Sequence, residues 1–308
     1  MDFGWHLPCF GRLATRENLI LVAREAETRG FESVFVSDHV ALPFEPKTPY
    51  GSSRTGTFPL PPTANFLEPL TALALVAAVT ERVRLGITVL VLPHRHPVLA
   101  AKTIATLDHL SGGRVIVGAG VGWLRDEIEL LGVPFGRRGR WSDEALQVMK
   151  RCWADERSKH DGAFFRFDDV GCYPKPVQKP YPPLWIGGRT AAAYRRVAHF
   201  GDGFHAAWSA PDVMGEQIRE VWKECEDVGR LGTDLTFSVR AGYSIREGAA
   251  PHPKASLLGA PWFIADQVRR YEDVGVSHIV LEAPARDLDE HLSLMRRFTE
   301  DIRPLTES

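Results

Sequence analysis

Short apolar runs and amphipathic segments alternate along almost the whole chain. Residues 85–92 and 115–117 are continuous apolar runs, which are typical of strands buried on both faces. With the neighbouring runs they predict strands at residues 3–7, 33–36, 85–92, 115–117, 183–187, 203–208, 235–245 and 278–282. Aromatic and polar residues alternate over residues 164–173, which predicts a small antiparallel excursion.

Apolar residues at helical spacing fill the intervals between these runs. Gly30 is expected to cap the C-terminus of the first helix, and Pro97 suits the first turn of another. The expected helices lie at residues 19–26, 70–77, 97–107, 141–152, 190–200, 211–228, 262–274 and 288–298. Regular alternation of strand and helix implies parallel strands joined by right-handed crossovers.

The chain length fits one closed barrel. An α/β fold of the (β/α)8 TIM-barrel type needs about 250 residues and often carries insertions, and this chain has 308 residues. We therefore expect residues 1–308 to form a single barrel domain, with insertions after strand C-termini at residues 40–66, 132–182 and 246–261. An open doubly wound sheet is the alternative fold, but the sequence marks no central switch point for it.

Composition narrows the range of partners. A formal net charge of -2 gives no electrostatic reason to expect nucleic acid or a membrane surface. Four cysteines lie far apart, which fits reduced, buried thiols better than disulfides or a zinc cluster. No signal-peptide pattern and no bilayer-length apolar segment is evident, so we expect a cytoplasmic protein. Whether it forms a homodimer is left open.

Glycines at positions 118, 120 and 122 follow the predicted strand at residues 115–117, and a helix is expected to open near Leu124. Repeated glycine at the end of a strand indicates that another backbone or a ligand comes close. The spacing does not match Gly-x-Gly-x-x-Gly, so a dinucleotide-binding fingerprint is not supported. Tight packing of neighbouring elements is one explanation, and a bare surface for a flat ring is the other.

The predicted strand tips carry small and aromatic residues with few ionisable groups. Chemistry in a TIM barrel takes place at these tips, and such a rim suits a large flat ring. One turn combines glycines, a cation and a helix N-terminus, which favours an anion site; it comprises Gly187, Gly188, Arg189 and Thr190. An ordinary strand–helix turn would explain the same residues.

Two histidine motifs follow strand ends. Asp38-His39 ends the second strand, where a histidine could exchange protons near neutral pH or simply be a hydrogen-bonded rim residue. His94-Arg95-His96 has the His-x-His spacing of some zinc hydrolases. Because no third ligand is evident, loop structure and helix capping are the favoured explanation for this second motif.

The motifs together closely resemble the bacterial luciferase-like flavin monooxygenase superfamily, and most closely its branch that uses the deazaflavin coenzyme F420. The likeness spans almost the whole chain and is carried by Leu92-Pro93, His96-Pro97, Ala101-Lys102, Ala105-Thr106-Leu107-Asp108, Leu110-Ser111-Gly112-Gly113-Arg114, Gly118-x-Gly120-x-Gly122-Trp123, Arg138-Gly139-Arg140, Pro183-Leu184-Trp185-Ile186-Gly187-Gly188 and Gly201-Asp202-Gly203. It implies a (β/α)8 barrel with the ring system of F420, or alternatively FMN, in its mouth.

The resemblance also implies site residues. The third strand of this family carries a bulge behind the ring, often with a non-proline cis peptide, which here falls at Thr88-Val89. We expect the ring to lie near the glycine tip, at Gly120 and Gly122. The family seats the coenzyme phosphate after the fifth strand, which maps onto Gly187, Gly188, Arg189 and Thr190.

Asp38 and His39 match the family's strand-two pair near the reactive ring. His39 is the expected proton partner, and Asp38 is expected to orient it or to contact the ring. Trp123 stands where sugar-phosphate dehydrogenases of the family carry a glutamate, so that substrate class is not expected. Trp123 is instead expected to stack on the ring or the substrate.

We therefore expect an F420-dependent oxidoreductase that moves a hydride between its coenzyme and a small apolar substrate. The loop of residues 40–66 would close part of the substrate side. Three alternatives stay open: an FMN-dependent monooxygenase on the same fold, a zinc-dependent TIM-barrel hydrolase using His94 and His96, and a flavin-binding protein without catalysis.

Overall fold

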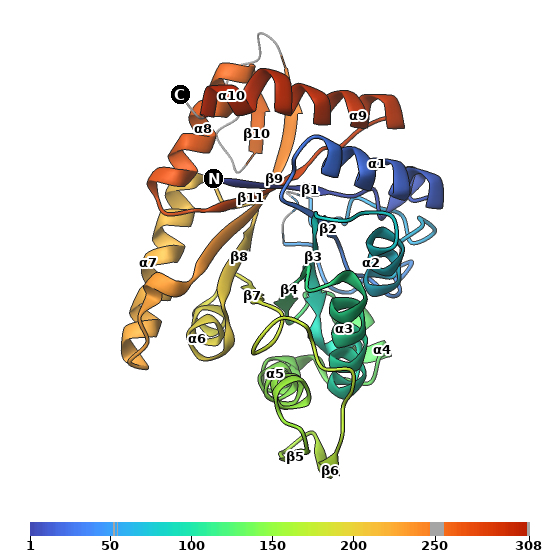
Figure 1. The fold of residues 1–308 in the computed structure, drawn as a ribbon, viewed down its shortest axis with the longest axis vertical. Helices are drawn as coiled ribbons and strands as arrows, with labels where there is room; N and C mark the ends of the chain where they lie inside the picture. Colours follow the sequence, from blue (N-terminus) through green and yellow to red (C-terminus); the bar gives the residue numbers. More distant parts are fainter. Residues whose placement is uncertain (52, 54, 247–255, 307–308) are drawn as a thin grey trace.

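The computed structural model describes residues 1–306 except 52, 54 and 247–255 (Figure 1). Most of the insertion predicted at residues 246–261 therefore lies outside the described residues. Elsewhere the predicted alternation of strand and helix is confirmed.

Parallel strands form the centre of the molecule and close into a barrel. β1 pairs with β2 and β11, and the pairing of β8 with β9 joins the two ends of the sheet. The prediction of a (β/α)8 barrel is therefore confirmed, and an open sheet is wrong. Within the described residues the eight barrel strands are β1 (Asp2–His6), β2 (Ser33–Val36), β3 (Arg84–Val91), β4 (Val115–Gly120), β7 (Leu184–Gly187), β8 (Gly203–Ala207), β9 (Thr236–Ile245) and β11 (His278–Glu282).

A long helix follows each barrel strand and lies on the outside of the barrel (Figure 1). Pro97 opens α3, and Gly30 follows the end of α1 with φ +73°, as the sequence predicts. These helices are α1 (Arg16–Thr28), α2 (Pro69–Ala77), α3 (Pro97–Ser111), α5 (Arg138–Ala154), α6 (Ala191–Phe200), α7 (Pro211–Asp227), α8 (Pro261–Asp273) and α9 (Leu288–Arg297).

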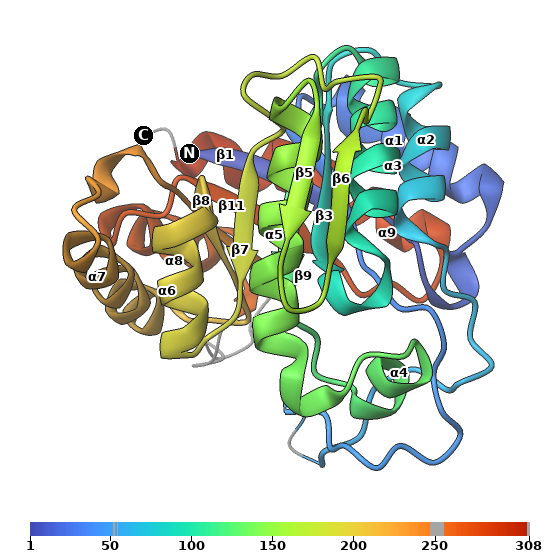
Figure 2. The same ribbon diagram turned by 90° about the horizontal axis from the view of Figure 1, so that it is seen from below.

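Shorter elements lie in the connections. An antiparallel hairpin packs beside α5 (Figure 2); the sequence predicted such an excursion, but its first strand lies upstream of the predicted range. A further strand pairs with β9 outside the barrel. These elements are η1 (Gly11–Leu13), η2 (Leu92–His94), α4 (Arg125–Leu130), η3 (Phe135–Arg137), β5 (Ser158–Asp161), β6 (Arg166–Val170), η4 (Gly232–Asp234), β10 (Ser256–Gly259), a π-helix (Phe298–Ile302) and α10 (Arg303–Thr306).

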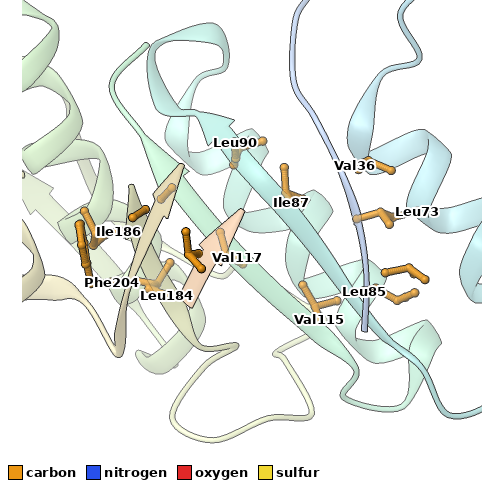
Figure 3. Close-up of a cluster of buried hydrophobic side chains, with 14 of the residues drawn as sticks. Val36, Leu73, Leu85, Ile87, Leu90, Val115, Val117, Leu184, Ile186 and Phe204 are labelled. Atoms are coloured by element: carbon orange, nitrogen blue, oxygen red, sulfur yellow. The ribbon is translucent and has the colours of Figure 1, made fainter. Parts of the chain in front are cut away.

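Two apolar layers hold the barrel together. Residues that point outward from the strands pack against the helices, as Val36 and Leu85 do beside Leu73 of α2 (Figure 3). The second layer fills the interior and consists of Phe35, Ile116, Trp185 and Val280. Gly86 makes room for Phe35, because a Cβ there would lie 2.2 Å from the Phe35 ring. All four cysteines are buried free thiols, as predicted.

A column of hydrogen-bonded polar side chains also crosses the barrel interior. His205 Nε2 lies 2.8 Å from Thr88 Oγ1, and its Nδ1 lies 2.9 Å from Ser238 Oγ. Ser238 Oγ lies 3.0 Å from His278 Nδ1, and His278 Nε2 lies 2.7 Å from Ser33 Oγ. Burial lowers the pKa of both imidazoles to about 3, so they are neutral polar members of the core. Among the described residues, no helix has the length and apolarity needed to cross a membrane.

Candidate active site

Aromatic rings pack around His39 beyond the C-terminal end of β2, and we call this group the aromatic cluster. The ring centroid of His39 is 5.1 Å from that of Phe58 and 5.2 Å from that of Phe66, both in the long loop after β2. Trp123, after β4, lies 6.1 Å from His39, and Tyr50 packs on Trp123 at 4.8 Å. The predicted loop therefore supplies much of an apolar wall around one imidazole.

Glu127 holds His39 in place. This buried carboxylate lies in the first turn of α4, and its Oε2 is 2.7 Å from His39 Nδ1. Its Oε1 accepts hydrogen bonds from the backbone N–H groups of Val40 and Ala41. Burial alone would raise the pKa of Glu127, but the hydrogen bond from His39 lowers it, as does the charge of His39 or His94 when that histidine is protonated. A carboxylate can only accept, so a neutral His39 donates from Nδ1 and keeps Nε2 as an acceptor.

Asp38 has a different partner from its neighbour His39. Its carboxylate accepts two hydrogen bonds from the Arg95 guanidinium, at 2.6 and 2.9 Å, and one from the Val91 N–H at 2.9 Å. Arg95 also donates to Glu68 at 2.8 Å. Burial would raise the pKa of Asp38, but contacts with His94 and Arg95 lower it to about 2. The geometry therefore gives Asp38 the role of anchoring Arg95 and β3, while Glu127 orients His39.

The two histidines of the His-x-His motif face different surroundings. His96 accepts a hydrogen bond from the Val98 N–H and caps α3, in agreement with the capping explanation. His94 is buried, with Nε2 3.4 Å from Glu127 Oε2. Across the part of the chain that the structure describes, no three His, Cys, Asp or Glu side chains are grouped to hold a metal ion. Among these described residues the zinc hydrolase alternative therefore lacks a ligand set.

The backbone of β3 departs from regular strand geometry near the barrel mouth. The Thr88–Val89 peptide is cis, and the register with β4 shifts between Ile87 and Leu90. The bulge predicted at Thr88-Val89 is confirmed.

The glycines of β4 and β7 make room for this bulge. A Cβ on Gly120 would lie 2.5 Å from a Val89 methyl group, and one on Gly187 would lie 2.8 Å from the other. Gly122 has φ +75°, and a Cβ there would also contact Ile128 at 2.9 Å. The glycine pattern therefore has a packing cause, since the neighbouring strand fills the space that the glycines leave.

Arg240 of β9 places a fixed positive charge beside the bulge. Its Nε donates to Glu282 Oε2 at 2.7 Å, and its Nη1 donates to the Thr88 carbonyl at 3.2 Å. Nη1 also lies 3.0 Å from Ser37 Oγ, which is 2.8 Å from His6 Nε2. Burial would lower the pKa of Arg240, but the Glu282 carboxylate raises it, so the guanidinium stays charged.

The turn after β7, which the sequence predicts as an anion site, is exposed. Gly188 has φ +136°, a conformation that L side chains rarely adopt. Thr190 caps α6 by accepting a hydrogen bond from the Ala193 N–H. The exposed Arg189 side chain approaches the loop after β2, because a Cβ on Gly51 would lie 3.2 Å from Arg189 Nη2. The long loop therefore extends from the aromatic cluster to this turn.

A cleft of about 1080 Å³ lies on another side of the barrel mouth, at the ends of β1, β9 and β11. Its lining includes His6, Phe10, Glu282 and His291. Phe10 also packs on Phe66 at 5.4 Å, so the wall of the cleft contacts the aromatic cluster.

The predicted site residues fall into three groups in the structure. His39 and Trp123 belong to the aromatic cluster, and Val89 of the cis peptide contacts the glycines of β4 and β7. The exposed turn forms the third group. Sequence reasoning missed the charged residues that organise these groups, which are Glu127, Arg95 and Arg240. A carboxylate in the helical turn that directly follows a glycine-rich strand tip was a usable signal for Glu127.

Comparison with known proteins fits this geometry. The family model described as luciferase-like monooxygenase matches residues 1–296. The chain belongs to this family. The solved structure of an F420-dependent secondary alcohol dehydrogenase in complex with an F420-acetone adduct has the same fold, with a TM-score of 0.81 and 18% identity over 100% of this chain and 99% of that chain.

Relatives within the family differ in coenzyme. An uncharacterized protein of Mycobacterium tuberculosis is 32% identical over 91% of this chain and 92% of its own length. An F420-dependent glucose-6-phosphate dehydrogenase of Nakamurella multipartita is 28% identical over 92% of this chain and 90% of its own. An FMNH(2)-dependent dimethylsulfone monooxygenase of Pseudomonas putida is 32% identical over 48% of this chain and 41% of its own. The chain is thus similar to both F420- and FMN-dependent enzymes.

Proposed function

We propose that this protein is an F420-dependent oxidoreductase that exchanges a hydride between the deazaflavin and a small, mostly apolar organic substrate. Its partner would be that substrate, with no nucleic acid or membrane surface involved. Interconversion of an alcohol and a carbonyl compound is the reaction class that best uses His39 and the aromatic rings around it.

The observation that carries the proposal is the His39–Glu127 pair. One imidazole is held through Nδ1 by a buried carboxylate, and among the described residues Nε2 has no hydrogen-bond partner. Aromatic rings surround it. Hydride exchange at a carbinol carbon requires a proton to leave or join the attached oxygen, and a placed histidine is suited to that transfer.

Residues in the barrel mouth fit a flavin-type coenzyme. The cis-peptide bulge of β3 packs against the glycines of β4 and β7, and Trp123 is an indole of the kind that stacks on flat rings. We assign ring contact to Thr88, Val89, Gly120, Gly122 and Trp123. The exposed turn with a helix N-terminus and a cation suits a phosphate, and we assign that contact to Gly187, Gly188, Arg189 and Thr190.

The coenzyme supplies two-electron hydride chemistry when bound, and the chain supplies orientation and the proton. His39 Nε2 accepts the hydroxyl proton of an alcohol or returns it to a carbonyl oxygen. Glu127 keeps the imidazole oriented, and the aromatic wall excludes water. Positioning of this kind contributes much of the rate in such reactions.

An FMN-dependent monooxygenase is the second candidate. Arg240 supports it, because a buried guanidinium at the barrel mouth could stabilise negative charge developing on oxygen. The similarity to an FMNH(2)-dependent monooxygenase points the same way.

Anaerobic titration with both coenzymes, followed by exposure to oxygen, separates the two candidates. We expect reduced F420 to bind at least tenfold, or about 1.4 kcal/mol, more tightly than FMN. Oxidation of the bound reduced F420 should require an organic acceptor rather than oxygen. Tight FMN binding with oxygen uptake on addition of a substrate would overturn the assignment in favour of a monooxygenase.

A further inference from the structure

Behind His39 lies a cluster of buried charges. The carboxylates of Asp38 and Glu127 are 4% and 1% exposed as residues, and His94 is 8% exposed. Arg95 completes the cluster through its paired hydrogen bonds to Asp38. These groups come from three separate segments, namely the end of β2, η2 with its following residue, and α4.

The charges of the cluster do not balance unless a histidine is protonated. Asp38 and Glu127 both have lowered pKa values and are ionised at neutral pH. Arg95 supplies one positive charge, and it is already bonded to Asp38 and to the half-exposed Glu68. A buried carboxylate without a counter-charge is costly. A positive charge beside Glu127 would therefore stabilise it, and His39 and His94 are the side chains beside it.

His94 is the histidine that lies between the two carboxylates. Its Nε2 lies 3.4 Å from Glu127 Oε2, and its Nδ1 lies 3.8 Å from Asp38 Oδ2. Nδ1 is buried without a hydrogen-bond partner. A neutral imidazole would turn a lone pair toward one of these carboxylates, which is repulsive, whereas an imidazolium presents N–H to both.

Other ionisable groups near η2 are committed elsewhere. On α5, which packs against η2, Asp143 pairs with Arg196 and Glu144 binds the N–H groups of residues 163–165. Arg138 donates to the Gly122 and Phe135 carbonyls. Of the described residues, Asp38 and Glu127 are the ones that form ion pairs with His94.

We propose that His94 is a protonated positioning residue that neutralises Glu127 and thereby keeps His39 uncharged, with Nε2 free to accept a proton from the substrate. The role assigned to His39 rests on the proposed function, whereas the charge of His94 does not. With His94 as imidazolium and Arg95 as guanidinium, the two carboxylates are balanced. His39 then presents a base, not an acid, to an alcohol substrate.

Nitrogen-15 NMR of the histidine-labelled full chain, without coenzyme, tests the charge directly. Between about pH 6 and 8 we expect both His94 nitrogens to carry protons and His39 to show one protonated and one bare nitrogen. In His94→Gln, which retains a donor toward Glu127 but not the charge, His39 should become doubly protonated at neutral pH. A singly protonated His94 in the wild type, or an unchanged His39 in the variant, would overturn the proposal.

The matched control is His96→Gln, the same change two positions along the chain at a residue that caps α3. It should leave the His39 spectrum unchanged. The wild-type spectrum alone decides the state of His94 if His94→Gln does not fold.

Turnover provides a second measurement that a purely structural role would not reproduce. His94→Gln should lower kcat roughly tenfold at neutral pH and regain most of that loss at higher pH, where His39 releases its extra proton. An equal loss at every pH would contradict the proposal. Failure of the wild type to turn over any alcohol or carbonyl compound with F420 would count against the proposed function, while the spectra would still report on His94.

Discussion

The side chain of Val89 occupies the space that Gly120 leaves empty: a Cβ on Gly120 would lie 2.5 Å from Val89 Cγ2. Neither residue can be changed without affecting the other. Gly120→Ala should destabilise the protein by about 1–3 kcal/mol, because overpacking a filled site forces neighbours to move. Urea unfolding followed by circular dichroism would measure this cost.

A double-mutant cycle tests the cause of that cost. Val89→Ala combined with Gly120→Ala should recover part of the stability lost in Gly120→Ala, since the clashing methyl groups are gone. Gly136→Ala is the control, because a Cβ at Gly136 meets nothing within 4 Å. Strict additivity of the two changes would show that Val89 does not fill the Gly120 site.

Removal of the His39 imidazole should impair chemistry far more than coenzyme binding. His39→Ala is expected to lower kcat by about 10²–10⁴-fold, the usual contribution of a placed proton-transfer group. Coenzyme affinity, measured by fluorescence titration, should change little. His109→Ala, at an exposed histidine of α3, should leave both quantities unchanged. A normal kcat in folded His39→Ala would assign the proton to water or to another side chain.

Arg189 should contribute to coenzyme affinity without contributing to stability. Its side chain is exposed in the turn after β7, so Arg189→Ala removes a charge and little packing. We expect coenzyme binding to weaken at least tenfold, in line with the loss of a hydrogen bond to a charged group. The control is Arg195→Ala, which removes another exposed arginine, from α6. Arg195 Nη1 lies 3.7 Å from Glu224 Oε1, and this variant should bind coenzyme normally. Equal affinity of the two variants would move the phosphate to another place.

Asp38 should make the free energy of unfolding depend on pH. Folding lowers its pKa to about 2, so its stabilising contribution of about 2 kcal/mol is present above its ordinary pKa and is lost as pH falls toward 2. Asp38→Asn should unfold more easily at neutral pH, by about 3 kcal/mol, and should lose this part of the acid dependence. Asp169→Asn, which removes an exposed partner of Arg157, should behave as wild type. Parallel pH profiles for Asp38→Asn and wild type would contradict this role.

The strands, the helices and the β3 bulge could be predicted because each depends on a short stretch of sequence. Apolar runs define buried strands, and Gly30 and Pro97 punctuate helices through their own backbone preferences. The partners inside the site depend on tertiary contacts instead. Glu127 and His39 are 88 positions apart, and Asp38 and Arg95 are 57 apart. Local patterns carry no information about such pairs.

Several local sequence patterns do not by themselves predict the contacts of their residues, because those contacts depend on the tertiary structure. An acidic residue in a first helical turn, such as Glu127, is ordinarily a solvated partner of the helix dipole, and only the barrel geometry buries it. The glycines of β4 were consistent with either packing or a ligand, and Val89 of the adjacent strand supplies the packing. The His-x-His spacing was equally ambiguous until His94 and His96 were placed in different surroundings.

The order of these groups along the chain has a consequence for how such enzymes diversify. The aromatic cluster and the buried charges behind it lie within residues 38–127. The exposed turn after β7 begins later in the chain, at Gly187. The β5–β6 hairpin, outside the barrel, separates the two stretches. Recombination between genes at this hairpin would join the His39 region of one parent to the turn after β7, the proposed phosphate contact, of another parent in a single step. Chimeras crossed there should inherit substrate preference from the N-terminal parent.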